Sequence, residues 1–184
     1  MAVFPVILDA NVLFGIFPTD LLITLAGRRL YRAHWTAEIL EEARRNVIAE
    51  RPDLDPSAVK RRFEAMKAAM PEAMLDPPPR NIVASMPNDE GDRHVLAAAV
   101  MARAEVIVTE NISDFSPQAC SPFGVEAQTL DQFLGYLVSL DADEVWRAIE
   151  EMSRRRTRPP VAVDDVVATL ERYAPAAIAQ LHEP

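Results

Sequence analysis

The chain has 184 residues, of which 49% are hydrophobic and 26% charged. This is the composition of a folded globular protein, and the length suits one domain with a small appendage. The net charge of −9 argues against a generally basic surface for binding nucleic acid, because phosphate groups need basic partners. No apolar run approaches the roughly 18 residues of a membrane span, and the start of the chain lacks the basic flank of a signal peptide, so we expect a cytoplasmic protein without a membrane partner.

The first half of the chain alternates strand patterns with helix patterns. Residues 6–8 form an apolar run typical of a buried strand, and the aromatic-rich run at 30–35 predicts a second strand. Helices are expected at 12–25 with a break near Pro18, at 36–49 after the N-cap Thr36, and at 56–70. The last two of these helices would form a hairpin.

The second half continues this alternation and then becomes helical. We expect strands at 81–84, 105–109 and 125–127, helices at 92–103 and 129–139, and a loop at 110–122. Beyond residue 140 we expect a helix from Asp141, an arginine-rich loop, and a helix at 164–181 that breaks at Pro175. The pattern predicts an α/β domain with a mainly parallel sheet at 1–139, followed by a helical appendage at 140–184.

Acidic side chains stand at the ends of several predicted elements. Asp9 directly follows the first strand, Asp114 comes shortly after the strand that ends at Thr109, and Asp92 opens a buried helix. Because the carboxyl ends of parallel strands meet at one edge of a sheet, acids from distant parts of the chain can converge there. Carboxylates are the hard oxygen ligands that Mg²⁺ and Mn²⁺ prefer, so the pattern predicts a metal site.

The strongest candidates also have ordinary structural explanations. Asp9 could cap the helix that follows it, and Asp89 with Asp92 has the spacing of a capping box. Glu41 and Glu42 flank the apolar stripe of their helix on opposite sides. Periodicity therefore leaves open which of the two glutamates faces a site and which faces solvent.

Other polar residues give weaker signals. Thr109 suits a strand, and Asn111 and Asp114 suit a turn, on backbone grounds alone. The single cysteine, Cys120, cannot form an internal disulfide and is interpreted as structural. The histidines share no metal-ligand spacing and are also expected to be structural: His34, His94 and His182.

Basic residues gather in clusters despite the negative net charge. The clusters are Arg28, Arg29 and Arg32; Arg44 and Arg45; Lys60, Arg61 and Arg62; and Arg154, Arg155, Arg156 and Arg158. They either provide a local surface for the phosphates of a nucleic acid or form ordinary solvated helix faces. An acidic protein of this kind can carry a basic patch, so the net charge alone does not exclude a nucleic-acid substrate.

Four ordered motifs resemble those of the PIN-domain nucleases. They are ILDANVL at 7–13, ILEEA at 39–43, DEGDRHVLAAA at 89–99 and VTENISDF at 108–115. The resemblance covers about residues 3–135 and is greatest to bacterial VapC-type toxins, which are magnesium-dependent ribonucleases held inactive by a cognate antitoxin. It implies a three-layer α/β/α domain, and the tail is similar to that of a longer-tailed subgroup.

The resemblance also implies roles for individual residues. They are Asp9, Asp92 and Asp114 as metal ligands, Glu42 as a further catalytic acid, and Asn11, Thr109 and Asn111 lining the site. Glu42 is preferred to Glu41 because the family's glutamate directly precedes a small or apolar residue, here Ala43. Asn111 stands where some members carry an acid, which puts the affinity for a second metal ion in doubt.

The implied reaction is the Mg²⁺- or Mn²⁺-dependent hydrolysis of RNA phosphodiester bonds, with single-stranded or looped RNA as the substrate. An antitoxin protein is the implied partner, and a homodimer stays open. One alternative is a non-catalytic PIN-like module that binds RNA or protein, which the retained acids argue against. Another is a phosphatase of the haloacid dehalogenase type, but Asn11 occupies the place of its second acid and no convincing lysine follows.

Overall fold

The computed structural model describes residues 3–182. Its centre is a five-stranded sheet in the order β3-β2-β1-β4-β5, in which every neighbouring pair is parallel. The strands are β1 (Pro5–Leu8), β2 (Arg32–Thr36), β3 (Met74–Leu75), β4 (Val106–Val108) and β5 (Glu126–Gln128). In the middle strand β1 every residue is buried, which explains its uninterrupted apolar sequence.

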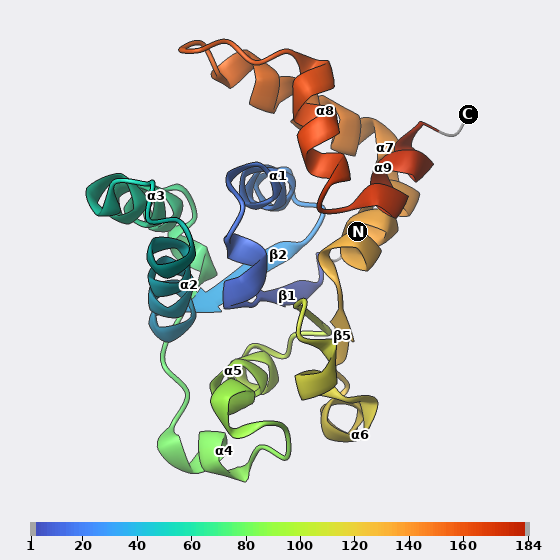
Figure 1. The fold of residues 1–184 in the computed structure, drawn as a ribbon. Coiled ribbons are helices and arrows are strands. Elements are labelled where there is room, and N and C mark those ends of the chain that lie inside the picture. The colour runs from blue at the N-terminus through green and yellow to red at the C-terminus, as the bar shows by residue number, and fades with distance from the viewer. Residues whose placement is uncertain (1–2, 183–184) are drawn as a thin grey trace.

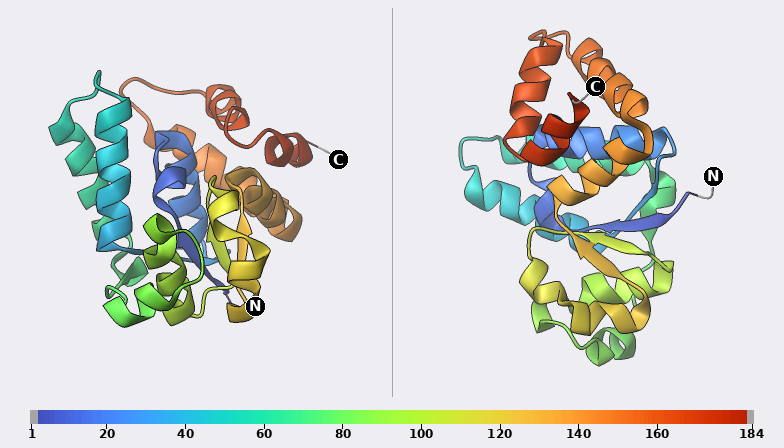
Figure 2. Two further views of the ribbon diagram at one scale, coloured as in Figure 1. Left: turned by 60° about the horizontal axis from the view of Figure 1, so that its bottom comes forward. Right: turned by 90° about the vertical axis from the view of Figure 1, so that its right-hand side faces the viewer.

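Helices cover both faces of this sheet (Figures 1 and 2). One layer contains α1 (Ile16–Gly27), α7 (Leu130–Arg155), α8 (Val163–Glu171) and α9 (Pro175–Leu181). The other contains α4 (Arg80–Ser85), α5 (Arg93–Ala102) and α6 (Pro117–Cys120). Helices α2 (Ala37–Glu50) and α3 (Pro56–Ala69) form a hairpin beside the β2 end of the sheet. The three-layer α/β/α architecture is therefore confirmed.

Local sequence signals explain where the main helices begin. The Thr36 hydroxyl accepts a hydrogen bond from the backbone of Ile39 at the start of α2, and the Asp55 carboxylate accepts one from Ser57 at the start of α3. Thr129 and Gln132 form the expected capping box at the start of α7. Helix α5 has a nearly all-apolar sequence because most of its residues are buried between the sheet and α4.

Three expectations about residues 1–139 were wrong in detail. Helix α1 begins at Ile16 and runs through Pro18, because a proline in the first turn lacks only an N–H that the helix does not use. The segment 81–84 belongs to helix α4 and not to a strand, whereas the third parallel strand is β3, which is only two residues long. The expected loop at 110–122 contains the helical turns η4 (Ile112–Phe115), α6 and the first residues of η5 (Ser121–Phe123).

The C-terminal region is helical, as expected. Helix α7 contains one residue with non-helical backbone angles, Asp141, whose carboxylate accepts a hydrogen bond from the backbone of Glu144. The break before Pro175 separates α8 from α9. A domain boundary at residue 139 stays a prediction. Among residues 3–182, no helix is both long and apolar enough to cross a membrane.

Candidate active site

Asp9 is held in one orientation at the carboxyl end of β1. It is 2% exposed, and its Oδ1 accepts a hydrogen bond from the backbone of Ala10 over 2.7 Å. Its Oδ2 accepts hydrogen bonds from the Thr109 hydroxyl over 2.7 Å and from the Asn11 amide over 2.9 Å. Asp9 therefore does cap the helical turn η1 (Ala10–Leu13), but with only one of its two oxygens.

Thr109 and Asn11 connect the ends of the neighbouring strands β1 and β4. The Asn11 amide nitrogen also donates to the Thr109 hydroxyl over 3.1 Å, and the Asn11 carbonyl oxygen accepts from the backbone of Glu110 over 3.0 Å. The backbone of Asn111 donates to the same Thr109 hydroxyl over 3.0 Å. Parallel pairing places these residues at one edge of the sheet, where Asn11 and Thr109 contact Asp9 and the backbone of Asn111 contacts Thr109.

Asp92 belongs to the same group of charges. Burial raises the pKa of Asp92, and the nearby carboxylates of Asp9, Asp114 and Glu42 also raise it, because each disfavours another negative charge; together they bring this pKa to about 6. The Asp92 side chain caps no helix; Asp89 does so instead, accepting from the backbone of Gly91 over 3.0 Å. The structure thus brings together all four predicted acids.

The two adjacent glutamates of α2 have different surroundings. Glu41 is exposed, and both of its oxygens accept hydrogen bonds from the Arg44 guanidinium, which lowers the pKa of Glu41. Glu42 is half-buried and turned toward the site, where burial and the Asp9 charge raise its pKa. The choice of Glu42 that sequence periodicity left open is therefore decided by geometry, although its catalytic role stays a proposal.

The pKa of Asp9 is also raised, and the cause is its burial in the floor of the site. The hydrogen bonds from Thr109, Ala10 and Asn11 act in the opposite direction, because they stabilise the charged carboxylate. Asp9 is thus buried but well supplied with donors. Donors of this kind fix the position of a negative oxygen before any ligand arrives.

His94 is a site residue that the sequence interpretation missed. It is 8% exposed, its Nδ1 donates to the Gly91 carbonyl over 3.0 Å, and its Nε2 lies 3.6 Å from an oxygen of Glu42. Within residues 3–182 this Nε2 is buried without a hydrogen-bond partner. A signal did exist: a histidine inside an otherwise apolar, buried helix must face something polar.

The donor set suits a hard divalent cation, since carboxylate, amide and hydroxyl oxygens are the ligands that Mg²⁺ and Mn²⁺ prefer. Within the described part of the chain, however, no three acidic, histidine or cysteine side chains are close enough to enclose an ion as they stand. Like charges without a cation between them repel each other, and this repulsion adds to burial in raising the pKa of Asp92. The residue types fit the metal, and small side-chain movements would be needed to bind it.

Several arginines of the basic clusters form contacts within the molecule. Arg28 pairs with Glu144 and Glu151, and Arg155 and Arg156 both pair with Asp20. Arg62 is largely buried, and its guanidinium donates to the backbone carbonyls of Leu13, Phe14 and Gly15. Acceptors within the molecule hold these arginines, and a phosphate-binding role for the basic clusters stays a prediction.

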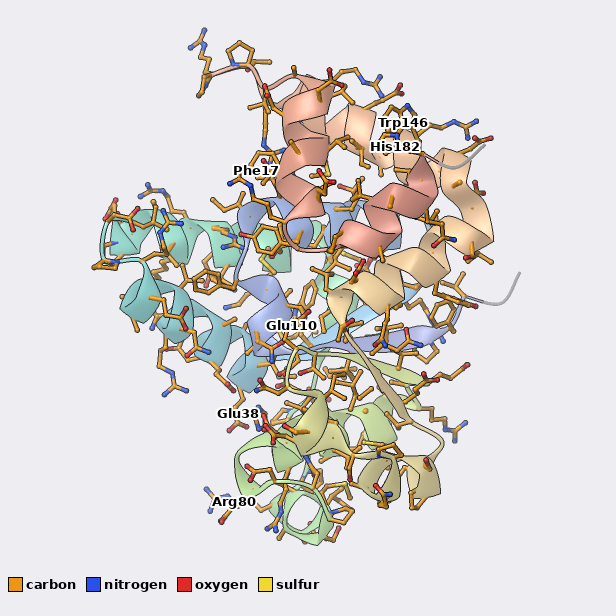
Figure 3. All side chains as sticks on the ribbon, turned by 45° about the vertical axis from the view of Figure 1, so that its right-hand side comes forward. Phe17, Glu38, Arg80, Glu110, Trp146 and His182 are labelled. Carbon is orange, nitrogen blue, oxygen red and sulfur yellow. The ribbon has the colours of Figure 1, made fainter. Side chains whose placement is uncertain are left out.

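The site lies at the carboxyl edge of the sheet, between the C-terminal helices and the α4–α5 layer. Figure 3 labels three charged residues around it: Glu110 on the segment after β4, Glu38 on α2 and Arg80 on α4. A parallel sheet lies between helical layers, and acids converge at this edge from α2, from η4, and from the positions directly after β1 and directly before α5. This arrangement defines a protein of the PIN nuclease class.

Comparisons with known proteins support this classification. The family model described as "PIN domain" matches residues 5–113, more than half of the chain, and the chain therefore belongs to the PIN domain family. The model described as "VapC50 C-terminal domain" matches residues 130–183. The two matches agree with the resemblance to VapC-type proteins that the motifs indicated.

One curated relative is the Mycobacterium tuberculosis protein named "Putative ribonuclease VapC50". It is 36% identical to this chain over 95 residues, which cover 52% of this chain and 56% of the relative. The match thus spans only about half the length of the relative. No solved structure matches the chain.

Proposed function

We propose that this protein is a divalent-metal-dependent ribonuclease. The observation that carries the proposal is the convergence of four carboxylates, Asp9, Glu42, Asp92 and Asp114: burial and the charges of the other three raise the pKa of Asp92. A cluster of like charges at the end of a parallel sheet costs folding free energy unless a ligand compensates it. The membership in the PIN domain family and the name of the relative favour RNA as the substrate.

In this proposal Asp9, Asp92 and Asp114 hold Mg²⁺ or Mn²⁺. The bound ion would supply Lewis acidity, making a water molecule more acidic and offsetting charge on the leaving oxygen. The hydrogen bonds from Thr109 and Asn11 keep Asp9 oriented for this task. The raised pKa of Glu42 makes it a better proton acceptor near neutral pH than an ordinary glutamate.

We further propose that the protein acts as the toxin of a toxin–antitoxin pair in the cytoplasm. An unpaired group of carboxylates offers an anchor for an arginine or lysine of an inhibitory protein. The division into a nuclease domain at 1–139 and a helical appendage at 140–184 belongs to the same proposal. The break in helical backbone at Asp141 supports this division, and a homodimer stays open.

The direct test is an RNA cleavage assay with the purified full chain in Mg²⁺, in Mn²⁺ and in EDTA. Asp9→Asn keeps the shape of the side chain but removes its charge, and should abolish cleavage. Asp143→Asn, an exposed acid on α7, is the matched control and should cut like the wild type. Cleavage by Asp9→Asn at the wild-type rate, or equal cleavage in EDTA, would contradict the proposal.

A further inference from the structure

A cavity opens next to Asn11, one of the residues that contact Asp9. Its volume is about 390 Å³, and its walls come from the η1–α1 segment, the end of α2, Glu110, and the residues Arg172 and Tyr173 that follow α8. Asn11 lines this cavity and also donates a hydrogen bond to Asp9. Asn11 therefore links Asp9 to a cavity that Arg172 and Tyr173 of the C-terminal region also line. In this part of the molecule α8 lies against α1.

The wall between the cavity and the core is held rigidly. The buried guanidinium of Arg62 donates to the carbonyls of Leu13 over 2.7 Å, Phe14 over 3.0 Å and Gly15 over 3.1 Å. Tyr173 packs closely on the same wall, since a β-carbon at Gly15 would lie only 3.0 Å from its Cζ atom. The cavity is thus preformed, with the phenol ring placed over a backbone that Arg62 fixes.

The side chains around the cavity suit a nucleobase better than a phosphate. Tyr173 is 43% exposed and Phe14 and Pro18 add apolar surface, so flat aromatic ligands would find partners for their faces. Glu50 and Glu110 also line the cavity. Their charges repel phosphate groups but accept hydrogen bonds from N–H groups on the edge of a base.

Glu110 is positioned for this recognition. Its Oε1 accepts a hydrogen bond from the backbone of Leu130 over 3.0 Å, which holds the side chain at the start of α7 and leaves the other oxygen for a ligand. Arg172 provides the one positive charge among the lining residues. It can contact the phosphate that follows the base.

We propose that this cavity holds one unstacked base of a single-stranded RNA, next to the phosphodiester bond that is cut, with Tyr173 stacked on the base. The proposal rests on the proposed function in taking RNA as the ligand. It assigns the C-terminal region a part in substrate binding, because Tyr173 and Arg172 lie outside the segment 5–113 that matches the PIN domain.

Fluorescence anisotropy tests the proposal with short labelled oligoadenylate, oligocytidylate and oligouridylate. The full chain carries Asp9→Asn and is kept in metal-free buffer, so that no hydrolysis is needed. Tyr173→Ala should weaken binding about 10-fold, as expected for the loss of one stacked base, whereas Tyr173→Phe should bind within about twofold of the parent. Tyr136→Ala removes an exposed tyrosine of α7 outside this cavity and should leave binding unchanged.

Equal affinity of Tyr173→Ala and its parent, in proteins with the same melting temperature, would overturn the cavity proposal. Absence of any RNA binding by the parent would overturn it too. The nuclease proposal fails separately, when the wild type with Mn²⁺ cuts no RNA although the anisotropy pattern holds. Glu50→Gln should reduce any excess of affinity for oligocytidylate over oligouridylate. Glu50 can accept a hydrogen bond from the amino group of cytosine, which uracil lacks.

Discussion

Charged residues are arranged in opposite ways in two regions of this protein. Between α1 and α7 they are paired: Arg28 lies 2.6 Å from Glu144 and 2.7 Å from Glu151. Arg155 and Arg156 lie 2.9 Å and 2.7 Å from the two oxygens of Asp20. At the carboxyl edge of the sheet, acids gather without such partners, and within residues 3–182 neither lysine nor arginine forms an ion pair with the four acids of the site.

The pKa values show what this difference means. Hydrogen bonds from Arg28 lower the pKa of Glu144 and of Glu151, so their ionised forms stabilise the fold. Burial and like charges raise the pKa of Asp92 and Glu42, so their ionised forms destabilise it. The first region is built to hold α7 on α1, where the Arg156 guanidinium also covers the labelled ring of Phe17 (Figure 3). The second retains unfavourable charge that only a ligand would relieve.

The largest effect in this comparison is expected for two neighbouring glutamates of α2. Glu42→Gln should lower the rate of metal-dependent RNA cleavage about 100-fold, a loss of about 2.7 kcal/mol of transition-state stabilisation, because it removes a charge from the site. Its neighbour provides the control: Glu41→Gln removes only an exposed pair with Arg44 and should cut RNA within about twofold of the wild type. Steady-state kinetics on one RNA substrate measure the cleavage rates of both variants. Equal losses of rate would contradict the distinction between the two glutamates.

The second prediction concerns stability against pH in metal-free buffer. Because the pKa of Asp92 is about 6 in the folded protein and its ordinary value is 3.8, the folded state binds more protons than the unfolded state between these two pH values. The stabilisation of the fold by protonated Asp92 is therefore fully present below about pH 4 and is lost as the pH rises through about 6. The loss should be about 1–2 kcal/mol, less than the whole pKa shift implies, because solvent screens this partly exposed carboxylate.

Asp92→Asn isolates this contribution from that of other acids. In EDTA, the variant should gain stability relative to the wild type as the pH rises from 4.5 to 7, which urea unfolding at both pH values measures. A difference between the two proteins that does not change with pH would show that Asp92 titrates as an ordinary exposed acid. The conclusion about stored repulsion would then be wrong.

The smallest effect is expected in the paired region. Asp20→Asn removes the common partner of Arg155 and Arg156, and should reduce stability by about 1 kcal/mol, with less loss at high salt. Cleavage of RNA by the folded variant should not change. A large loss of activity without loss of structure would mean that this region takes part in catalysis, contrary to the comparison.

Most of the fold could be predicted because its signals are local. The apolar run of β1, the capping threonines Thr36 and Thr129, and the buried α5 pattern each specify their own element. Errors occurred where tertiary contacts outweigh local preference. Strand β3 has only two residues and exists because it pairs with β2 at Trp35 and Thr36, which no periodicity can indicate.

Most residues of the site could be predicted from the sequence, but not all the contacts between them. Strand ends and family motifs indicated Asp9, Asp92 and Asp114, and the family motif also favoured Glu42 over Glu41. Periodicity alone left that choice open, and the folded arrangement turns Glu42 toward the other acids. His94 was missed because its meaning depends on the distance to Glu42 across two helices. The internal use of Arg62 was equally hidden, since its acceptors are backbone carbonyls about 47 to 49 positions away.

The central claim is that the unpaired acids form a metal site, and thermal unfolding with and without Mn²⁺ tests it most directly. At about 100 times its dissociation constant, Mn²⁺ should stabilise the wild type by about 2.7 kcal/mol, or about 5–10 °C in melting temperature. Asp9→Asn should melt higher than the wild type in EDTA and gain much less from Mn²⁺, whereas Asp20→Asn should keep the full gain. An unchanged wild-type midpoint in verified Mn²⁺ excess, or the same gain in Asp9→Asn, would contradict the claim.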